Sequence, residues 1–476
     1  MAMSMPRFWA FLAIALPVAA SLVASLSTVD LTYQLRAGAG ILATGAIPRV
    51  DSWTYTVPGL PWFDQQWGAQ VLLAVVERVG GWAGLALLRA GLVGGIVGCL
   101  FVIARRATLT ARSAGLLTIV AFLVAAPALA LRPQLLGMGL FALVLLLVSD
   151  RRTHRRRCWL IPVIVLCWAN IHGSFVLGPL VVGLAWLADV HDRFPRPHRL
   201  LAIAAISVLV ACVTPFGPAV WTYAASLSID PFVTQQISEW QRTSLGDPAG
   251  VLFFMSVVAV VGLAVVRRRA VSWPMLVWLG VFVAIGLYAV RGVAWWSLAV
   301  IPVVAALLAA GQPVPAREWP GTRAMRRLNL ALAAFIVVIA LAFVPTWRPV
   351  DPATAAPIGL LTDAPPGVTA TLRDLVAPGD RMFAPQPWGS WFEYAVPDLP
   401  VAVDSRIELF PASVWAAYDD VITGRGDWSG VLDRWGVTVV VVGAGVDGDA
   451  FAKRLSATGW RQIYVGEDGW VFRATR

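Results

Sequence analysis

A cluster of carboxylates, arginines, amides and aromatic residues follows the first apolar segment of the chain. Asp30 stands where the apolar run 8–29 ends. The polar and aromatic residues that follow it are Tyr33, Gln34, Arg36, Arg49, Asp51, Trp53, Tyr55, Trp62, Asp64, Gln65, Gln66 and Trp67. A carboxylate can accept a proton or hold a cation, an arginine can bind phosphate, and a tryptophan can stack on a sugar ring. The cluster therefore predicts a site for a sugar phosphate, with Asp30, Asp51 and Asp64 as candidate catalytic residues.

Two readings of this cluster are open at the level of the sequence. A carboxylate at the boundary of an apolar segment with this many polar neighbours favours a functional site. Alternatively, Asp30 caps a helix that begins at Leu31, and the tryptophans form an aromatic belt at a membrane surface.

Later apolar segments also end in residues that could bind substrate. Arg132 and Arg291 could hold a lipid-linked phosphate, or their side chains could reach lipid headgroups. His172 could bind phosphate or relay a proton, or could bond to a carbonyl at a helix end. Glu239, next to Trp240, could form a second wall of a sugar site, or could be a solvated loop acid.

The composition requires most of these residues to be positioned by membrane helices. The chain has 476 residues, of which 58% are hydrophobic and 13% charged, and its mean hydropathy is +0.73. Such a composition is typical of a multi-pass membrane protein. Apolar segments recur at about 8–29, 83–104, 113–130, 133–149, 158–171, 174–189, 200–213, 251–266, 271–290, 293–311 and 329–344. We expect about eleven transmembrane helices, with the first retained as a span rather than removed as a signal peptide.

The distribution of charge predicts the orientation in the membrane. Residues 1–349 contain 27 arginines and 11 acids, whereas residues 350–476 contain 10 basic and 16 acidic residues. The arginines of the first part cluster in short connectors, at 105–112, 151–157, 193–199, 267–269 and 317–327. Such clusters mark cytoplasmic loops and not a nucleic-acid surface. The N-terminus is therefore expected in the cytoplasm, with the long loops 30–82 and 214–250 and the part from 350 onward outside.

The part of the chain after residue 350 predicts a soluble extracytoplasmic α/β domain. Strands are expected at 380–396, 400–410, 437–443 and 461–474, and helices at 413–424, 428–436 and 449–460. Segment 363–378 is the expected entry into this domain. Within 400–410, Asp404 and Arg406 predict an internal ion pair. Within the first external loop, residues 62–80 predict an amphipathic helix lying along the outer membrane surface.

Two familiar kinds of site are not expected. Gly443, Gly445 and Gly448 have the form of a dinucleotide fingerprint, but they do not follow the first strand of their domain. They predict a strand-to-helix turn, and no nicotinamide cofactor is expected. The four cysteines have neither a disulfide framework nor metal-ligand spacing.

Several stretches resemble one class of bacterial membrane protein. The first loop reads DLTYQLRAGAGILATGAIPRVDSWTYTVPGLPWFDQQWG. It is similar in order and spacing to the first external loop of polytopic glycosyltransferase-like proteins, in which an acid leads to G-x-I-P-R-x-D and then to P-W-x-x-x-E-W-L. The stretches LRPQL, WANIHGSF, TPFG, EWQ and WGSWFEYAVPDLPVAVDSRIELF extend the likeness over most of the chain. The chain thus resembles GT-C-fold enzymes of the protein mannosyltransferase and lipid A arabinosyltransferase group.

The resemblance implies a fold, a donor and a set of contacts. It implies a GT-C-like membrane domain over 1–349 and a polyprenyl-phosphate-linked sugar donor in the membrane. The implied substrate-binding residues are Tyr33, Gln34, Arg36, Arg49, Gln66, Trp67, Arg132, Gln134, Asn170, His172, Glu239, Trp240 and Arg291. Tyr33-Gln34 stands where the pattern has Trp-His, and Gln65-Gln66 stands where it has His-Glu. Neutral amides thereby replace a base or metal ligand of the pattern. The sequence leaves open whether a divalent cation such as Mg²⁺ or Mn²⁺ is bound. Asp30 is the expected base.

The leading hypothesis is an inverting membrane glycosyltransferase that transfers a sugar to an extracytoplasmic acceptor, either an envelope glycan or a protein. The alternative is a transporter, a flippase-like carrier or a scaffold for envelope glycan assembly. A transporter should carry ionisable groups near mid-span. Arg89 is the notable residue of that kind, whereas the acids gather at one rim, and this asymmetry favours chemistry at the membrane surface.

Overall fold

The structure is a computed structural model that describes residues 2–107, 109–229, 237–310 and 318–475. Two compact units are present. The helical unit comprises Met1–Ala24 and Ala86–Val344, and the α/β unit comprises Ser25–Leu85 and Pro345–Arg476. The first predicted external loop and the C-terminal part of the chain therefore belong to the same unit. Residues 230–236 of the second predicted external loop, and Arg317 of the last arginine cluster, lie outside the described residues.

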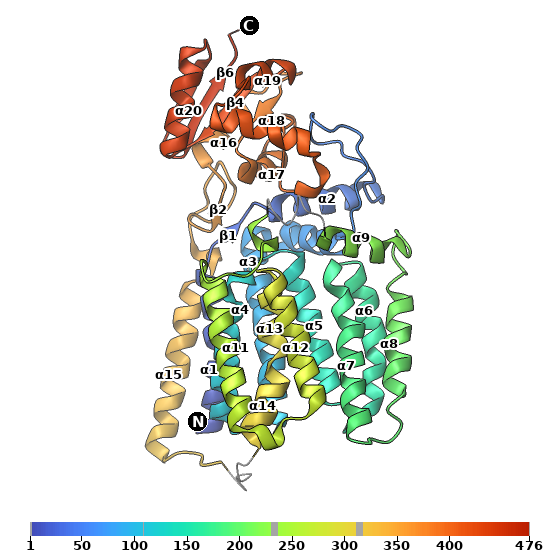
Figure 1. Ribbon diagram of the computed structural model, residues 1–476. Coiled ribbons are helices and arrows are strands. Elements are labelled where there is room, and N and C mark those ends of the chain that lie inside the picture. Colours follow the sequence, from blue (N-terminus) through green and yellow to red (C-terminus); the bar gives the residue numbers. More distant parts are fainter. Residues whose placement is uncertain (1, 108, 230–236, 311–317, 476) are drawn as a thin grey trace. The chain divides into compact units, whose positions relative to one another are not determined.

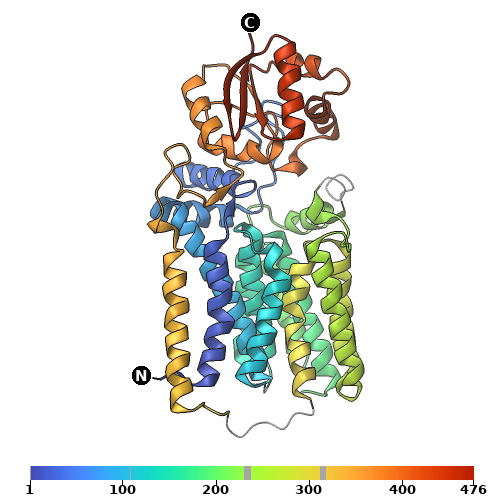
Figure 2. The same ribbon diagram turned by 90° about the vertical axis from the view of Figure 1, so that its left-hand side faces the viewer.

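The helical unit is a bundle in which most helices run side by side (Figures 1 and 2). Its helices are α1 (Met5–Val23), the second half of α3 (Trp67–Arg106), α4 (Ala111–Ala125), α5 (Pro133–Ser149), α6 (Ile161–Ala169), α7 (Leu177–His191), α8 (Arg199–Val210), α9 (Ala219–Ile229), α11 (Pro248–Val266), α12 (Trp273–Tyr288), α13 (Gly292–Ala299), α14 (Ile301–Ala309) and α15 (Arg323–Ala342). Proline stands in the first turn of α5, α6, α11, α12 and α14. A missing N–H does no harm there, because the first turn has no partner for it within the helix.

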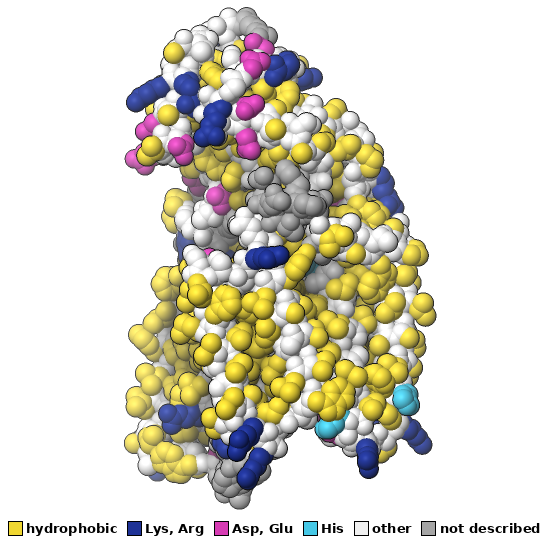
Figure 3. All heavy atoms as spheres, in the orientation of Figure 1, with side chains coloured by type: hydrophobic (Ala, Val, Ile, Leu, Met, Phe, Trp, Pro, Cys, Tyr) yellow, Lys and Arg dark blue, Asp and Glu magenta, His cyan; other side chains and the backbone are white. Residues whose placement is uncertain are grey.

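Length and surface composition suit these helices to a membrane. Within the described residues, seven helices are long and apolar enough to cross one, and three shorter apolar helices accompany them. Hydrophobic side chains cover the face of the bundle seen in Figure 3. Val258 of α11 is 72% exposed and Val338 of α15 is 63% exposed. The predicted multi-pass helical membrane protein is confirmed, while the number of eleven spans stays a prediction.

The two ends of the bundle differ in charge. The arginine clusters at 105–112, 151–157, 193–199 and 267–269 follow α3, α5, α7 and α11. Residues from the ends of α3, α5 and α7 line one cavity with the start of α12, which shows that these connectors share an end of the bundle. We call it the arginine end. Arg132 lies at the opposite end, because it precedes α5 whereas Arg151 follows that helix.

Arg89, the ionisable residue that the sequence places at mid-span, has a structural role. Its Nη2 atom donates to the carbonyl oxygens of Ser21 (2.6 Å) and Ala24 at the end of α1. The last carbonyls of a helix have no partner within the helix, and a guanidinium there also opposes the negative end of the helix dipole. Arg89 is 4% exposed and caps α1.

A four-stranded mixed sheet forms the centre of the C-terminal part of the α/β unit. Its strands are β3 (Met382–Phe383), β4 (Val439–Gly443), β5 (Arg461–Gly466) and β6 (Gly469–Arg473). The order is β3-β4-β6-β5, with β3 parallel to β4 and the other pairs antiparallel. A separate parallel pair joins β1 (Leu26–Ser27) to β2 (Leu361–Thr362) in the register Leu26↔Leu361. Strands from both chain segments of the unit thus pair directly.

Helices complete the unit, and the predicted α/β class is confirmed. They are α2 (Leu31–Thr44), the first half of α3, α16 (Pro366–Leu375), α17 (Gln386–Ala395), α18 (Ala412–Thr423), α19 (Trp428–Arg434) and α20 (Val446–Ala457). The three helices predicted after residue 410 correspond to α18, α19 and α20. The segment predicted as the entry into the domain contains the helix α16.

Two predicted strands are wrong. Segment 380–396 contains the two-residue strand β3 followed by the helix α17, although its aromatic residues favour a strand. Segment 400–410 forms only isolated bridges at Val401 and a short 3-10 helix, Ile407–Leu409. Segment 461–474 forms a hairpin of two strands rather than one. Tertiary contact overrode local preference here, since a Cβ at Gly389 of α17 would lie 2.2 Å from the Val403 carbonyl oxygen.

Glycines shape two turns that the sequence singles out. Gly443 ends β4, and Gly445 precedes α20 with a φ of 132°, which a residue with a side chain rarely adopts. The triple-glycine stretch is therefore a strand-to-helix turn, as predicted. The predicted amphipathic helix begins at Trp67 and continues as α3, with a break at Gly81 (φ 57°, ψ −157°). Val79 on its apolar face is 85% exposed, whereas Leu73 is fully buried. Its position along a membrane surface stays a prediction.

Replacing Arg89 with Met should leave the terminal carbonyls of α1 without their donor. We expect a loss of roughly 1–3 kcal/mol of unfolding free energy, which a thermal melt of the purified protein in detergent would record as a lower melting temperature. Arg242→Met is the matched control, because Arg242 is exposed in a loop. Equal melting temperatures for the two variants would contradict the capping role.

Candidate active site

In the α/β unit, Asp30 lies at the start of α2 beside the 404–408 segment. It occupies the N-cap position, but its side chain makes no capping hydrogen bond and its backbone is helical (φ −96°, ψ −22°). The hydroxyl of Ser405 donates to the carbonyl oxygen of the preceding residue, Val29. This bond brings residues that are far apart in the sequence together.

A close approach between α2 and the first half of α3 positions the next polar residues. A Cβ at Gly38 would lie 2.0 Å from the Gln70 carbonyl oxygen, so only glycine allows this contact. On the same helices, Gln34 Nε2 donates to the Tyr33 hydroxyl and to Gln66 Oε1, each at 2.6 Å. The two neutral pairs that depart from the resembled pattern, at 33–34 and 65–66, thus bond to each other through Gln34 and Gln66.

Several carboxylates surround the phenol of Tyr33. Desolvation raises the pKa of Tyr33 well above its ordinary value, and the negative charges of Asp30, Glu408, Asp64 and Asp404 raise it further. The phenol therefore stays protonated and can donate a hydrogen bond. This group of acids comes from three separate chain segments.

Asp64 is a buried carboxyl group that titrates near neutrality. It is 3% exposed, and its Oδ1 atom accepts from Gln70 Nε2 at 2.6 Å. Its Oδ2 atom has no hydrogen-bond partner within the described residues. Burial raises the pKa of Asp64 to about 7, against the lowering effect of the Gln70 bond. Asp64 can therefore gain or lose a proton at neutral pH.

Asp51 pairs with Arg406 inside the unit. Arg406 Nη2 lies 2.7 Å from Asp51 Oδ1, and both side chains are fully buried. The other oxygen of Asp51 accepts from the hydroxyl (2.7 Å) and the backbone N–H (3.1 Å) of Thr54. The rings of Trp53 and Trp62 lie 4.5 and 4.6 Å from the guanidinium carbon of Arg406. Asp51, the cation and the two tryptophans form one structural cluster.

Asp404 and Glu393 complete this cluster. Arg406 donates to Asp404 through Nε (2.9 Å) and Nη2 (2.5 Å), so the predicted internal ion pair is present. Glu393 of α17 lies 3.7 Å from Arg406 with no exposed surface. Desolvation, and then the charge of Asp404, raise the pKa of Glu393 well above its ordinary value. With Glu393 neutral, Arg406 is left with two buried carboxylates.

The remaining predicted residues of the first loop lie around this cluster. Arg36 places its guanidinium carbon 4.8 Å from the ring of Trp53. Desolvation lowers the pKa of Arg36, and the positive charge of Arg406 lowers it further. Arg49 is exposed, and Trp67 begins α3.

In the helical unit, two predicted arginines meet one predicted acid. Arg132 Nη2 lies 2.6 Å from Glu239 Oε1, and Arg291 Nη2 lies 3.0 Å from Glu239 Oε2. Burial would raise the pKa of Glu239, but the charges of Arg132 and Arg291 outweigh it and lower the pKa. The guanidinium carbon of Arg291 also lies 4.5 Å from the ring of Trp240. Glu239 is therefore an ion-paired residue and not a solvated loop acid.

The backbone holds this arrangement in place. The N–H of Arg291 donates to the carbonyl of Glu239, and the N–H of Val290 donates to the carbonyl of Gln241, both at 3.0 Å. The loop residues are thereby tied to the connector after α12. The cluster of Arg132, Glu239 and Arg291 carries one net positive charge.

His172 is neutral and directed by Ser174. Its Nδ1 atom accepts from the Ser174 backbone N–H at 3.1 Å and lies 2.7 Å from the Ser174 hydroxyl oxygen. Because Nδ1 is an acceptor, the ring proton belongs on Nε2. Desolvation, with the charges of Arg291 and Arg132, lowers the pKa of His172 to about 3. The Nδ1 atom of His172 thus contacts a hydroxyl and a backbone N–H, and not the carbonyl that the alternative expects.

Two further predicted residues of the helical unit differ in their surroundings. Asn170 Nδ2 donates to the carbonyls of Leu166 (3.0 Å) and Val213 (3.1 Å), which ties the end of α6 to the end of α8. Gln134 is 2% exposed, and neither atom of its amide has a partner within the described residues. A buried amide without partners is costly, so Gln134 is suited to bonding a ligand.

No group of three or more His, Cys, Asp or Glu side chains in the described parts of the chain is arranged to hold a metal ion. The predicted residues therefore fall into two clusters, one in each unit. The carboxylates around Tyr33 belong to the α/β unit, and the arginines paired with Glu239 belong to the helical unit.

Sequence analysis missed three participants. Glu393 and Glu408 were assigned to strands, and Gln70 was treated only as part of an amphipathic helix. Glu393 is the one acid in the apolar stretch WGSWFEYAV. An isolated acid in such a stretch is a signal for a buried ionisable group that could have been used.

The chain has the GT-C fold of membrane glycosyltransferases, as comparison with solved structures shows. AglB, an archaeal oligosaccharyltransferase from Archaeoglobus fulgidus, was solved in complex with an inhibitory peptide and a dolichol-phosphate. It matches with a TM-score of 0.54 and 12% identity over 98% of this chain and 74% of that chain. ArnT from Cupriavidus metallidurans, solved bound to undecaprenyl phosphate, matches with a TM-score of 0.52 and 16% identity over 97% of both chains.

The apo form of the Archaeoglobus fulgidus oligosaccharyltransferase gives a TM-score of 0.53 at 13% identity, covering 98% of this chain and 74% of that chain. No protein-family model matches the sequence, and no curated protein is significantly similar to it. At these identities the likeness establishes the fold alone. The GT-C fold that the resemblance implies is therefore confirmed.

Replacing Arg406 with Met should destabilise the protein severely. Asp51 and Asp404 would remain buried without their cation, at a cost of roughly 3–5 kcal/mol. Asp51→Asn should be milder, because Asp404 and Arg406 still balance each other. Melting temperatures of the purified variants would compare the two, and a milder effect for Arg406→Met than for Asp51→Asn would contradict this account.

Asp64 should make stability fall with rising pH. The folded state holds the proton up to about pH 7, whereas the unfolded state releases it near 3.8, so unfolding free energy is lost between those values. Asp64→Asn should therefore stabilise the protein by up to about 4 kcal/mol at pH 8 and by less at pH 5. The measurement is a melting curve at each pH, with the exposed Asp374→Asn as control. A gain that does not change with pH would exclude the raised pKa.

Proposed function

We propose that this protein is a membrane glycosyltransferase that takes a sugar from a polyprenyl-phosphate donor. The observation that carries the proposal is the convergence of Arg132 and Arg291 on Glu239 beside His172. One net positive charge suits the single negative charge of a polyprenyl-phosphate sugar. The solved structures of the same fold with dolichol-phosphate and undecaprenyl phosphate support a donor of this chemical class.

The arginine cluster would act on the leaving group. As the bond between the anomeric carbon and the phosphate oxygen breaks, the electron pair remains on the phosphate and its charge grows. Guanidiniums already held in place by Glu239 stabilise that charge without having to be reorganised. Neutral His172 would donate through Nε2, and the amide of Gln134 would supply further bonds.

The carboxylate group of the α/β unit would act on the acceptor. Asp30 would take the proton of the acceptor hydroxyl while the acceptor oxygen bonds to the anomeric carbon, which inverts that centre. The position of Asp30 beside Tyr33 and Glu408 supports this role. Asp64 would hold or release a proton nearby, and Tyr33 would donate a hydrogen bond.

The orientation and acceptor are part of the same proposal. The arginine clusters support a cytoplasmic arginine end and N-terminus, with the α/β unit outside the cell membrane. The acceptor would then be an envelope glycan or an exported protein. Arg89 caps α1. It therefore does not support the transporter alternative.

Asp30→Asn should abolish sugar transfer while leaving the protein folded. Loss of a general base typically lowers a rate by 10²–10⁴-fold, so we expect at least a roughly 100-fold loss of product. Mass spectrometry of envelope glycans and glycoproteins would first identify the product by comparing cells with and without the chain. The variant is then assayed in membranes for that product.

Two arms sharpen this test. Asp374→Asn, an exposed acid of the same unit, should retain activity. Arg132→Gln and Arg291→Gln should weaken transfer, whereas Arg242→Gln should not, and assays with EDTA would decide whether a divalent cation takes part. Unchanged transfer in Asp30→Asn would refute its role as base, and unchanged transfer in both arginine variants would refute the phosphate site.

A further inference from the structure

A second basic cluster lies at the arginine end of the helical unit. A pocket of about 200 Å³ is bounded by the 3-10 helix Arg155–Leu160, the connector after α7 and the start of α8. The arginines that line it are Arg151, Arg155, Arg156, Arg196 and Arg199, and the single acid is Asp189. The positive-inside rule accounts for arginines in these connectors, but it does not require them to share a pocket.

The acid of this pocket is already engaged. Asp189 accepts from Arg151 (2.8 Å) and Arg152 (2.9 Å). Within the described residues, Arg155, Arg156 and Arg196 form no ion pair with an acid. Cations that share a pocket repel one another, so an anion between them would be bound favourably.

Aromatic rings hold the guanidiniums of two lining arginines, Arg155 and Arg199, and that of the neighbouring Arg152. The guanidinium carbons of Arg155 and Arg152 lie 4.5 and 5.3 Å from the ring of Phe194, and that of Arg199 lies 5.5 Å from the ring of Trp159. A guanidinium stacked on a ring keeps its N–H edge available for a bidentate contact with phosphate.

The backbone adds a second indication that the side chains matter. Arg196 has a φ of 58°, in the left-handed region that glycine adopts without strain. A glycine would therefore suit the turn better than arginine does. Arg193 of the same connector is also left-handed (φ 52°), and of these two arginines it is Arg196 that lines the pocket.

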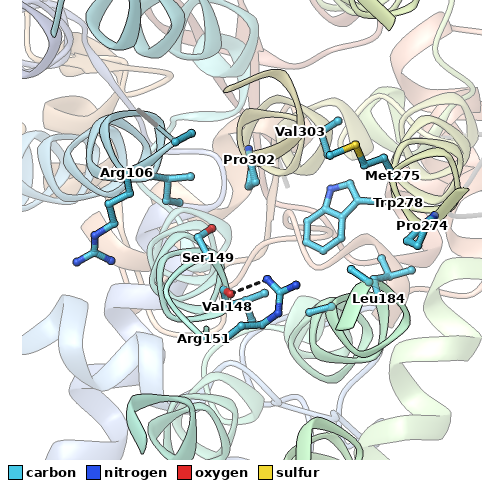
Figure 4. Close-up of a pocket in the computed structure, with 14 residues that line it drawn as sticks. Arg106, Val148, Ser149, Arg151, Leu184, Pro274, Met275, Trp278, Pro302 and Val303 are labelled. Carbon is cyan, nitrogen blue, oxygen red and sulfur yellow. Dashed lines mark hydrogen bonds between the residues drawn. The ribbon is translucent and has the colours of Figure 1, made fainter. Parts of the chain in front are cut away.

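The surroundings favour a lipid over free phosphate. A cavity of about 260 Å³ shares Arg151 with the basic pocket and is lined by apolar side chains that include Leu184, Trp278 and Val303 (Figure 4). Leu160 is 54% exposed at the end of the 3-10 helix that borders the pocket. Basic pockets between membrane helices are known to take lipid headgroups.

We propose that this basic pocket binds the phosphate headgroup of an anionic phospholipid and that the neighbouring cavity accepts part of an acyl chain. The site lies at the opposite end of the bundle from Arg132, Glu239 and Arg291. It is independent of sugar transfer.

Lipid binding to the delipidated protein in detergent tests the proposal. Cardiolipin and phosphatidylglycerol should raise the melting temperature and appear as bound adducts in native mass spectrometry, whereas phosphatidylcholine and inorganic phosphate should do neither. Combined replacement of Arg155, Arg156 and Arg196 by Gln should weaken binding of the anionic lipids about 100-fold. Binding of inorganic phosphate with equal effect would overturn the assignment to a lipid.

A matched variant controls for charge alone. Combined replacement of Arg267, Arg268 and Arg269 by Gln removes the same charge at the same end of the bundle, and it should leave lipid binding within about threefold. Equal losses of lipid binding in the two triple variants would show that the lipids are attracted non-specifically by positive charge. That result would overturn the proposed site. Arg196→Gly should relieve the left-handed strain, so the lipid-free protein should melt no lower than wild type while binding weakens. Unchanged binding in Arg196→Gly and in the first triple variant would also overturn the proposal.

Discussion

A charge that is removed from water must find an opposite charge or a full set of hydrogen bonds, and this requirement organises both units. Arg406 is fully buried in the α/β unit, where Asp51, Asp404 and the faces of two tryptophans surround it. Asp51 comes from the first loop and Arg406 from the C-terminal part. The ion pair therefore joins two segments that are separated by most of the membrane helices, and neither segment could bury its charge alone.

The same requirement has different solutions in the helical unit. Arg89 satisfies its charge on the carbonyls that end α1, so it stabilises a helix end instead of marking a transport path. Glu239 satisfies its charge with Arg132 and Arg291, which leaves one positive charge in excess. The first arrangement is complete within the protein. The second has capacity for an anion, and this difference separates a structural cation from a candidate binding site.

The sequence predicted the membrane class, the α/β class and most residues of the two clusters, because composition, charge runs and residue type carry that information directly. It failed for segments 380–396 and 400–410. Their aromatic and β-branched residues favour strands, yet α17 forms where Gly389 permits close contact with the Val403 carbonyl. It also could not distinguish Asp51, which is committed to Arg406, from Asp30 and Asp64. The three acids have the same residue type and similar neighbours in the sequence, and only their contacts differ.

The sequence by itself determined that the chain is a membrane protein with basic connectors and a polar first loop, since hydropathy and charge are properties of the residues and need no partner. The tertiary structure alone decided which acids surround Tyr33, which arginines meet Glu239, and that Asp64 titrates near neutrality. These properties depend on distance and on exclusion of water. Both arise only when segments far apart in the sequence pack together, as α2 and α3 do at Gly38.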